Sequence, residues 1–311
     1  MKQIELWREG KDEYALNNGF TLKKADKIEF GIHETIYSNV DLELSFSWEK
    51  RTQDKMDNEN LFWIYKDYKR VGGVHICPNL MGSLFMETPY DNEKINVINA
   101  LNEALLQWRG KDKNTIKIYG VIPDHVEYFS KLGYGISHSR RVMIRPTEVF
   151  HEIGCGEGVV MKTPSICDAP QIGKLFLESY SGGVDYKAFG KPSLEEAIKN
   201  VEYLLRIYES NNILHGSTLV FDKNTNDLIA ACIAGISGFC DNDFSEIGEI
   251  AVKPSHRKSG LGSMMIKRAL SNLKKISPAT ILCVTIGNPA EDLYSSLGFL
   301  PGVKFTNMYL E

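Results

Sequence analysis

Residues 246–270 read EIGEIAVKPSHRKSGLGSMMIKRAL and combine a short apolar strand, a basic glycine-containing loop and an amphipathic helix. Pro254 ends the predicted strand because proline cannot donate a hydrogen bond to a sheet ladder. Apolar residues at helical spacing after Gly260 predict a helix whose first turn has free backbone N–H groups. Such groups favour a bound anion, and Gly260 and Gly262 let the backbone approach it closely. The stretch therefore predicts a pyrophosphate-binding turn.

Two separated motifs show a resemblance to a known family. The spacing Arg257-x-x-Gly260-x-Gly262 lacks the terminal Lys-Ser/Thr pair of nucleoside-triphosphatase loops. It resembles the acetyl-coenzyme A signature of the GNAT acetyltransferase superfamily, Gln/Arg-x-x-Gly-x-Gly/Ala. A second stretch, IGNPAEDLYSSLGF at residues 286–299, resembles the family motif that ends in Leu-Tyr-x-x-x-Gly-Phe. The resemblance covers about residues 159–311 and implies an N-acetyltransferase that uses acetyl-coenzyme A (acetyl-CoA) as co-substrate.

The resemblance also implies how the coenzyme would be held. Backbone amides of the glycine loop would bind its phosphates, and basic side chains nearby would supply positive charge. A backbone N–H on the preceding strand would polarise the thioester carbonyl, as in an oxyanion hole. Asn288 would either contact the coenzyme's amide arm or cap the helix that begins at Pro289. The predicted coenzyme-binding residues are Ile250, Ala251, Val252, Lys253, Arg257, Lys258, Ser259, Gly260, Leu261, Gly262, Ser263, Asn288 and Tyr294.

Acetyl transfer to an amine also needs a base and an acid. An alkyl ammonium has a pKa of about 10.4, so a base or a water chain must take its proton. The resemblance favours Glu246 as the base, with Glu249 as its competitor, and strand alternation predicts that they lie on opposite faces. Tyr294 is the implied acid for the leaving thiolate. The alternatives are that both carboxylates are solvated at a strand edge and that Tyr294 only packs.

The first half of the chain shows the same order of predicted strands and helices without the chemistry. A predicted strand at 83–86 is followed by acidic residues and no glycine loop, so a phosphate bound there would be repelled. Residues 128–134, YFSKLGY, repeat the second motif, and aligning Gly133 with Gly298 places Phe129 opposite Tyr294. This half is therefore interpreted as a degenerate copy that binds no coenzyme.

The predicted fold class is α/β, with two tandem GNAT-like domains. Each domain is expected to be a mixed, largely antiparallel twisted sheet flanked by helices. The degenerate domain is placed at residues 1–147 and the catalytic domain at residues 159–311. The linker is placed at 148–158, where glycines at 154, 156 and 158 indicate irregular backbone.

The composition is that of an ordinary soluble globular protein, with 43% hydrophobic and 24% charged residues among 311. A net charge of −4 gives no indication of nucleic acid or an anionic membrane as a partner. Six scattered cysteines without a C-x-x-C pair favour a reducing, cytoplasmic location. Seven histidines without ligand spacing predict no metal site.

The expected partner is an acceptor that carries a primary amine, either a small molecule or a peptide. The segments 180–191 and 241–244 are expected to shape its site, although they match no specificity pattern. The alternative function is a coenzyme A-binding sensor or scaffold without turnover. Such a protein would keep the glycine loop but would need neither Tyr294 nor a base.

Overall fold

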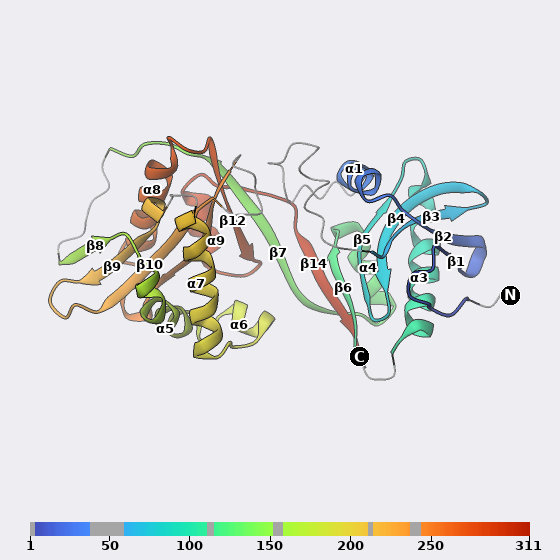
Figure 1. Cartoon of the computed structure of the whole chain (residues 1–311), viewed down its shortest axis with the longest axis horizontal. Coiled ribbons are helices and arrows are strands. Elements are labelled where there is room, and N and C mark those ends of the chain that lie inside the picture. Colours follow the sequence, from blue (N-terminus) through green and yellow to red (C-terminus); the bar gives the residue numbers. More distant parts are fainter. Residues whose placement is uncertain (1–3, 38–58, 111–114, 152–157, 211–213, 237–243) are drawn as a thin grey trace. The chain divides into compact units, whose positions relative to one another are not determined.

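The computed structural model describes residues 4–37, 59–110, 115–151, 158–210, 214–236 and 244–311. The chain divides into two compact units, each with its own strands and helices (Figure 1). The first unit comprises Met1–Arg140 together with Val303–Glu311, and the second comprises Arg141–Gly302. The strand pairing in each unit is mixed and largely antiparallel, so the predicted fold class is confirmed.

The division between the units differs from the predicted boundary in two places. The strand β7 (Gly135–Pro146) passes from the first unit into the second at Arg141, before the predicted linker begins. The C-terminal strand β14 (Phe305–Leu310) belongs to the first unit because it pairs with β6 (Ile116–Val121) and with residues 135–140 of β7. Residues 152–157 of the predicted linker lie outside the described residues.

The sheet of the second unit runs in the order β7, β12, β11, β10, β9, β8. Strands β8 to β11 pair antiparallel, whereas β11 and β12 are parallel. A two-residue strand, β13 (Leu300–Pro301), pairs with β7. The bounds are β8 (Val159–Lys162), β9 (Thr218–Asp222), β10 (Leu228–Gly235), β11 (Ser245–Val252) and β12 (Ala279–Thr285).

Helices cover both faces of this sheet. The helix α8 (Leu261–Leu273) packs apolar side chains against Ile247 and its neighbours on one face. The helices α5 (Ala169–Tyr180) and α7 (Leu194–Ser210) cover the other face, where Ala251 is buried among their side chains. Two short helices complete the unit, α6 (Val184–Phe189) and α9 (Ala290–Ser296). The predicted capping box at the start of α7 is present, with Ser193 N–H donating to Glu196 Oε2 at 2.7 Å.

A bulge and an early end to strand pairing shape the middle of this sheet. Ala234 of β10 pairs with Ile247 and Ile233 pairs with Glu249, so Gly248 is an extra residue in β11. The parallel pairing of β11 with β12 covers Ser245–Ile247, and it extends no further within the described residues. Beyond Ile247 the two strands have no pairing among the described residues, and we refer to this unpaired stretch as the gap.

The first unit repeats this plan, in the strand order β1, β2, β3, β4, β5, β6, β14, β7. Its β5 pairs parallel with β6 at Leu80 and Met81, and the register between β4 and β5 also shifts. The core packs α3 against one face of the sheet and α1 against the other. The bounds are β1 (Glu13–Ala15), β2 (Phe20–Lys24), α1 (Lys27–Tyr37), β3 (Leu61–Lys66), β4 (Lys69–Cys77), β5 (Leu80–Met86), α3 (Lys94–Trp108) and α4 (Pro123–Lys131).

The last helices of the two units end in the same way. Tyr134 N–H donates to Phe129 O at 3.1 Å after α4, and Phe299 N–H donates to Tyr294 O at 3.0 Å after α9. The intervening glycines have φ values of +93° and +84°, a conformation that glycine adopts without strain. This shared geometry supports the alignment of Phe129 with Tyr294.

Candidate active site

The glycine loop lies at the N-terminus of α8, as the sequence predicts. Gly260 caps the helix in a left-handed conformation, with φ at +83°. The first hydrogen bond into the helix is donated by Met264 N–H to Gly260 O at 3.0 Å. The N–H groups of residues 261–263 precede it, so the helix itself supplies them with no acceptor. A Cβ on Gly260 would meet no other atom within 4 Å, so open space lies beside these donors.

Arg257 has a structural role in addition to its charge. Its guanidinium donates from Nη2 to Ser179 O at the end of α5 and from Nε to Val252 O at 3.3 Å. The side chain thus ties the end of β11 to α5. Lys253, His256 and Lys258 also lie at this loop, and none of them forms an ion pair within the described part of the chain. The loop is therefore a cationic turn with free N–H groups.

The backbone of β11 presents donors to the gap beside β12. Lys253 N–H donates to Ile229 O of β10 at 2.8 Å, so the alternating groups of Val252 and Ile250 face away from β10. Their carbonyl oxygens are taken by Arg257 and by the Tyr180 hydroxyl at 3.0 Å. The N–H groups of Ile250 and Val252 point to the same side, where the sequence predicts an oxyanion contact.

The two predicted carboxylates lie on one face of β11 and not on opposite faces. The Tyr208 hydroxyl of α7 donates to Glu246 Oε1 at 2.6 Å, and the Tyr180 hydroxyl of α5 donates to Glu249 Oε2 at 2.6 Å. Both helices cover the same face of the sheet. The prediction from simple alternation was wrong because the bulge at Gly248 turns every later side chain over.

Burial sets the protonation of this group of side chains. It raises the pKa of Glu246 above the ordinary carboxylate value, and the hydrogen bond from Tyr208 opposes the rise. Burial also raises the pKa of Tyr208 and of Tyr180, with their neighbouring carboxylates adding to the effect. Both tyrosines are therefore neutral hydrogen-bond donors near pH 7.

Tyr294 lies buried in α9, with 7% of its surface exposed and its ring packed edge-on against Phe299. Burial raises the pKa of Tyr294, and the nearby Cys232, Glu249 and Asp185 raise it further. Its hydroxyl makes no hydrogen bond to any described residue. The hydroxyl oxygen itself is not fully enclosed, so solvent or a ligand can reach it. The hydroxyl is thus a protonated donor available to a ligand.

Asn288 caps α9, and its side chain is engaged at both ends. Its Oδ1 accepts from Ala290 N–H at 3.0 Å, and its Nδ2 donates to Asp185 Oδ2 at 3.1 Å. Asp185, on α6, also accepts from the Thr285 hydroxyl at 2.6 Å. The sequence leaves two roles open for Asn288. The structure shows that it caps α9, and its contact with the coenzyme stays a prediction.

Comparison with known proteins identifies the family of this region. Residues 215–301 match the acetyltransferase (GNAT) domain family, and this range includes β9, β10, β11, α8, β12 and α9. Residues 215–301 are a GNAT acetyltransferase domain. A comparison with curated protein sequences gave no match.

Solved structures of GNAT proteins share the fold of the whole chain. A GCN5-related N-acetyltransferase from Sphaerobacter thermophilus has 13% identity and a TM-score of 0.65, covering 96% of this chain and 97% of that one. A tandem GNAT protein from the clavulanic acid biosynthesis pathway has 12% identity and a TM-score of 0.50, covering 96% and 98%. A glucosamine N-acetyltransferase region of a fungal multi-domain β-N-acetylglucosaminidase has 13% identity and a TM-score of 0.59, covering 97% and 39%. These matches establish the tandem GNAT fold.

The sequence analysis assigned no role to three side chains that lie at the candidate active site, namely Tyr180, Asp185 and Tyr208. Tyr180 and Asp185 fall in the segment 180–191 that was assigned to the acceptor, but no role was predicted for them. Tyr208 carried no local signal, because its contact with Glu246 depends on how α7 packs on the sheet. Of the other acceptor segment, 241–244, residues 241–243 lie outside the described residues.

The first unit has no counterpart of the glycine loop between β5 and α3. The Glu87 carboxylate lies 2.8 Å from Arg70 Nε and 2.8 Å from His33 Nδ1. Glu93, directly before α3, accepts from Lys66 Nζ at 2.7 Å, and this hydrogen bond lowers the pKa of Glu93. A phosphate at this turn would therefore meet carboxylates that already neutralise the nearby cations.

We expect one coenzyme to bind per chain, in the second unit. The turn between β5 and α3 lacks a glycine loop, and Phe129 lacks the hydroxyl that Tyr294 carries, so the two groups assigned to coenzyme binding and catalysis in the second unit have no counterpart at these positions. Isothermal titration with acetyl-CoA should give a stoichiometry near one. Two equivalent sites per chain would show that the degenerate-copy interpretation is wrong.

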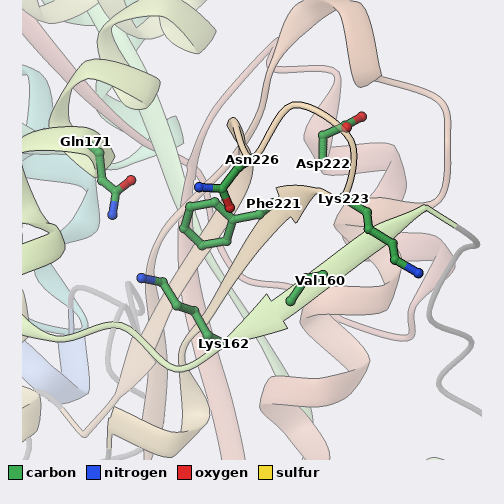
Figure 2. Close-up of a pocket in the computed structure, with 7 residues that line it drawn as sticks. All are labelled: Val160, Lys162, Gln171, Phe221, Asp222, Lys223 and Asn226. Atoms are coloured by element: carbon green, nitrogen blue, oxygen red, sulfur yellow. The ribbon is translucent and has the colours of Figure 1, made fainter.

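A surface pocket of the GNAT-domain unit lies apart from this site, at the β8–β9 edge of the sheet (Figure 2). Its volume is about 360 Å³, and it is lined by Val160, Lys162, Gln171, Phe221, Asp222, Lys223 and Asn226. Lys162 pairs with Asp168 at 2.9 Å and lies 4.8 Å from the centre of the Phe221 ring. These contacts give the lysine a structural role.

No helix among the described residues has the length and apolar character needed to cross a bilayer.

Proposed function

We propose that the GNAT domain is an acetyl-CoA-dependent N-acetyltransferase that moves the acetyl group directly to a primary amine of a small molecule or peptide. The observation that carries this proposal is the Tyr294 hydroxyl, which has no hydrogen-bond partner among the described residues and lies near Glu249 of the strand that precedes the glycine loop. A protein that only bound the coenzyme would need the loop but would have no use for a buried acid at this place.

The residues present fit the co-substrate. The free N–H groups of residues 261–263 and the cations of the loop suit a pyrophosphate. Open space beside Gly260 leaves room for it. The N–H groups of Ile250 and Val252 suit the thioester carbonyl, because fixed donors stabilise the negative charge that develops on its oxygen.

The side chains divide the proton transfers between them. A carboxylate, Glu246 or Glu249, takes a proton from the acceptor ammonium, and the neutral amine attacks the thioester carbonyl. The C–S bond breaks as the amide forms, and the nitrogen releases its second proton to solvent. Tyr294 donates its phenolic proton to the leaving thiolate and regains one from solvent. The raised pKa of Tyr294 keeps that proton in place until the thiolate forms.

An acceptor screen tests this function against the sensor alternative. The full chain is incubated with acetyl-CoA and with amines, amino sugars, peptides and antibiotics, and release of the free thiol is recorded. We expect release that depends on the amine, together with an acetylated product found by mass spectrometry. Tight acetyl-CoA binding without turnover across the panel would favour the sensor.

We expect Gly260→Asp to weaken acetyl-CoA binding by at least about tenfold. The new carboxylate would stand beside the pyrophosphate donors and repel the phosphates. Aspartate tolerates a positive φ better than most residues, so the loop should still form. Calorimetry measures the loss. Gly158→Asp is the matched control, because Gly158 has φ at +89° and also faces open space at the start of β8. Equal affinity of the Gly260→Asp and wild-type proteins would end this assignment of the loop.

A further inference from the structure

We propose that Tyr208 is a positioning residue that holds Glu246 as the base for the acceptor ammonium, an inference that rests on the proposed function. It selects one of the two carboxylates that the site offers. It also gives a role to a buried tyrosine that lies outside both the glycine-loop motif and the motif that contains Tyr294.

The sheet is built to admit this tyrosine. Tyr208 is fully buried, and its hydroxyl donates to Glu246 Oε1 at 2.6 Å. A Cβ on Gly235 of β10 would lie 2.4 Å from its ring, and a Cβ on Gly248 of β11 would lie 2.7 Å from its hydroxyl. The adjacent strands β10 and β11 therefore each have a glycine where the Tyr208 side chain packs against the sheet. Packing on both sides fixes the ring, so the hydroxyl has one direction in which to donate.

The contact leaves Glu246 able to act as a base. One carboxylate oxygen is fixed by Tyr208, while Oε2 accepts no hydrogen bond from the described residues. Glu249 is held differently, because its partner Tyr180 also contacts Ile250 O, the carbonyl beside the predicted oxyanion donor. Glu249 therefore belongs with the groups that order the backbone of the gap.

The charges around Glu246 are few. Tyr208 from α7 faces it, and Glu249 on the same strand and Cys232 on β10 are the other titratable groups that act on Tyr208. In the step itself, the ammonium gives one proton to Glu246 Oε2 and becomes the neutral amine. A donated hydrogen bond stabilises the ionised carboxylate, so Tyr208 keeps Glu246 ready to accept a proton at a lower pH than burial alone would allow.

The test uses the full chain and two readouts. The first is the acidic limb of the pH profile of kcat/KM with an amine acceptor, and the second is the ¹³C carboxyl titration of Glu246, assigned with Glu246→Gln. Tyr208→Phe removes the hydroxyl and keeps the ring. We expect both the limb and the titration of Glu246 to move up by about 1 to 2 pH units, the effect of losing one hydrogen bond to a charged group.

Two further variants make the test specific. Gly248→Ala places a methyl group against the Tyr208 hydroxyl, so it should move the limb in the same direction while the tyrosine remains. Tyr180→Phe is the matched control, since it removes the corresponding hydrogen bond to Glu249 and should leave the limb in place. An unmoved limb and an unmoved Glu246 titration in Tyr208→Phe would overturn the inference. If the wild-type chain acetylates no amine, the proposed function fails, and the carboxyl titration still decides whether Tyr208 controls Glu246.

Discussion

Tyr294→Phe should bind acetyl-CoA as tightly as the wild-type protein but transfer the acetyl group about 10²- to 10⁴-fold more slowly, the usual loss for a general acid. The substitution removes one hydroxyl and leaves the ring packed on Phe299. Phe129 occupies the corresponding place in the first unit and is also buried, so phenylalanine is sterically acceptable in this setting. Coenzyme binding should persist because the loop at 258–263 is unchanged.

The deficit of this variant should shrink as the pH rises. A thiol has a pKa of about 8.5, so above that pH the thiolate leaves without needing a proton. Single-turnover kinetics across this range measure the effect. Tyr134→Phe is a suitable control, because it removes a buried hydroxyl in the first unit, where it donates to Asn102 Oδ1 at 3.0 Å. A folded Tyr294→Phe protein with the wild-type rate of chemistry would show that Tyr294 only packs.

Glu246→Gln should lower kcat/KM by about 10²- to 10⁴-fold near neutral pH, because glutamine cannot accept the ammonium proton. The acidic limb assigned to Glu246 should disappear from the profile. In its place, kcat/KM should rise tenfold per pH unit as the free amine forms, up to the ammonium pKa of about 10.4. Added small bases should restore part of the activity.

Glu249→Gln is the matched comparison for this experiment. It removes the other carboxylate on the same face of β11 and should keep the acidic limb. If Glu249→Gln loses the limb and Glu246→Gln retains it, the two assignments are exchanged. If neither variant changes the profile, a water chain takes the proton and both carboxylates are structural.

Local features of the sequence predicted much of the second unit. The strand that ends before Pro254, the positive-φ turn at Gly260 and the helix that follows depend on neighbouring residues alone. The same holds for the capping box at Ser193 and for the turn at Gly298. These features predicted the glycine loop at the start of α8 and placed Tyr294 in a helix, as the structure has them.

Features that depend on distant pairing could not be predicted. The bulge at Gly248 is a property of the register with β10, and alternation along β11 alone gave the wrong face for Glu249. The strand β14 joins the first unit through pairing with β6, which follows no local pattern. The contact between Tyr208 and Glu246 needs α7 docked over two glycines of neighbouring strands. The bulge, the pairing of β14 and the Tyr208–Glu246 contact all depend on tertiary packing, which no short sequence motif specifies.

A crystal structure of the full chain with bound acetyl-CoA tests the central claim most directly. We expect one coenzyme, with its pyrophosphate on the N–H groups of residues 261–263 and its thioester carbonyl at the N–H of Ile250 or Val252. The sulfur should lie within hydrogen-bond reach of the Tyr294 hydroxyl. A coenzyme bound away from the glycine loop, or with its sulfur far from Tyr294, would contradict the assignment of this region as an acetyl-transfer site.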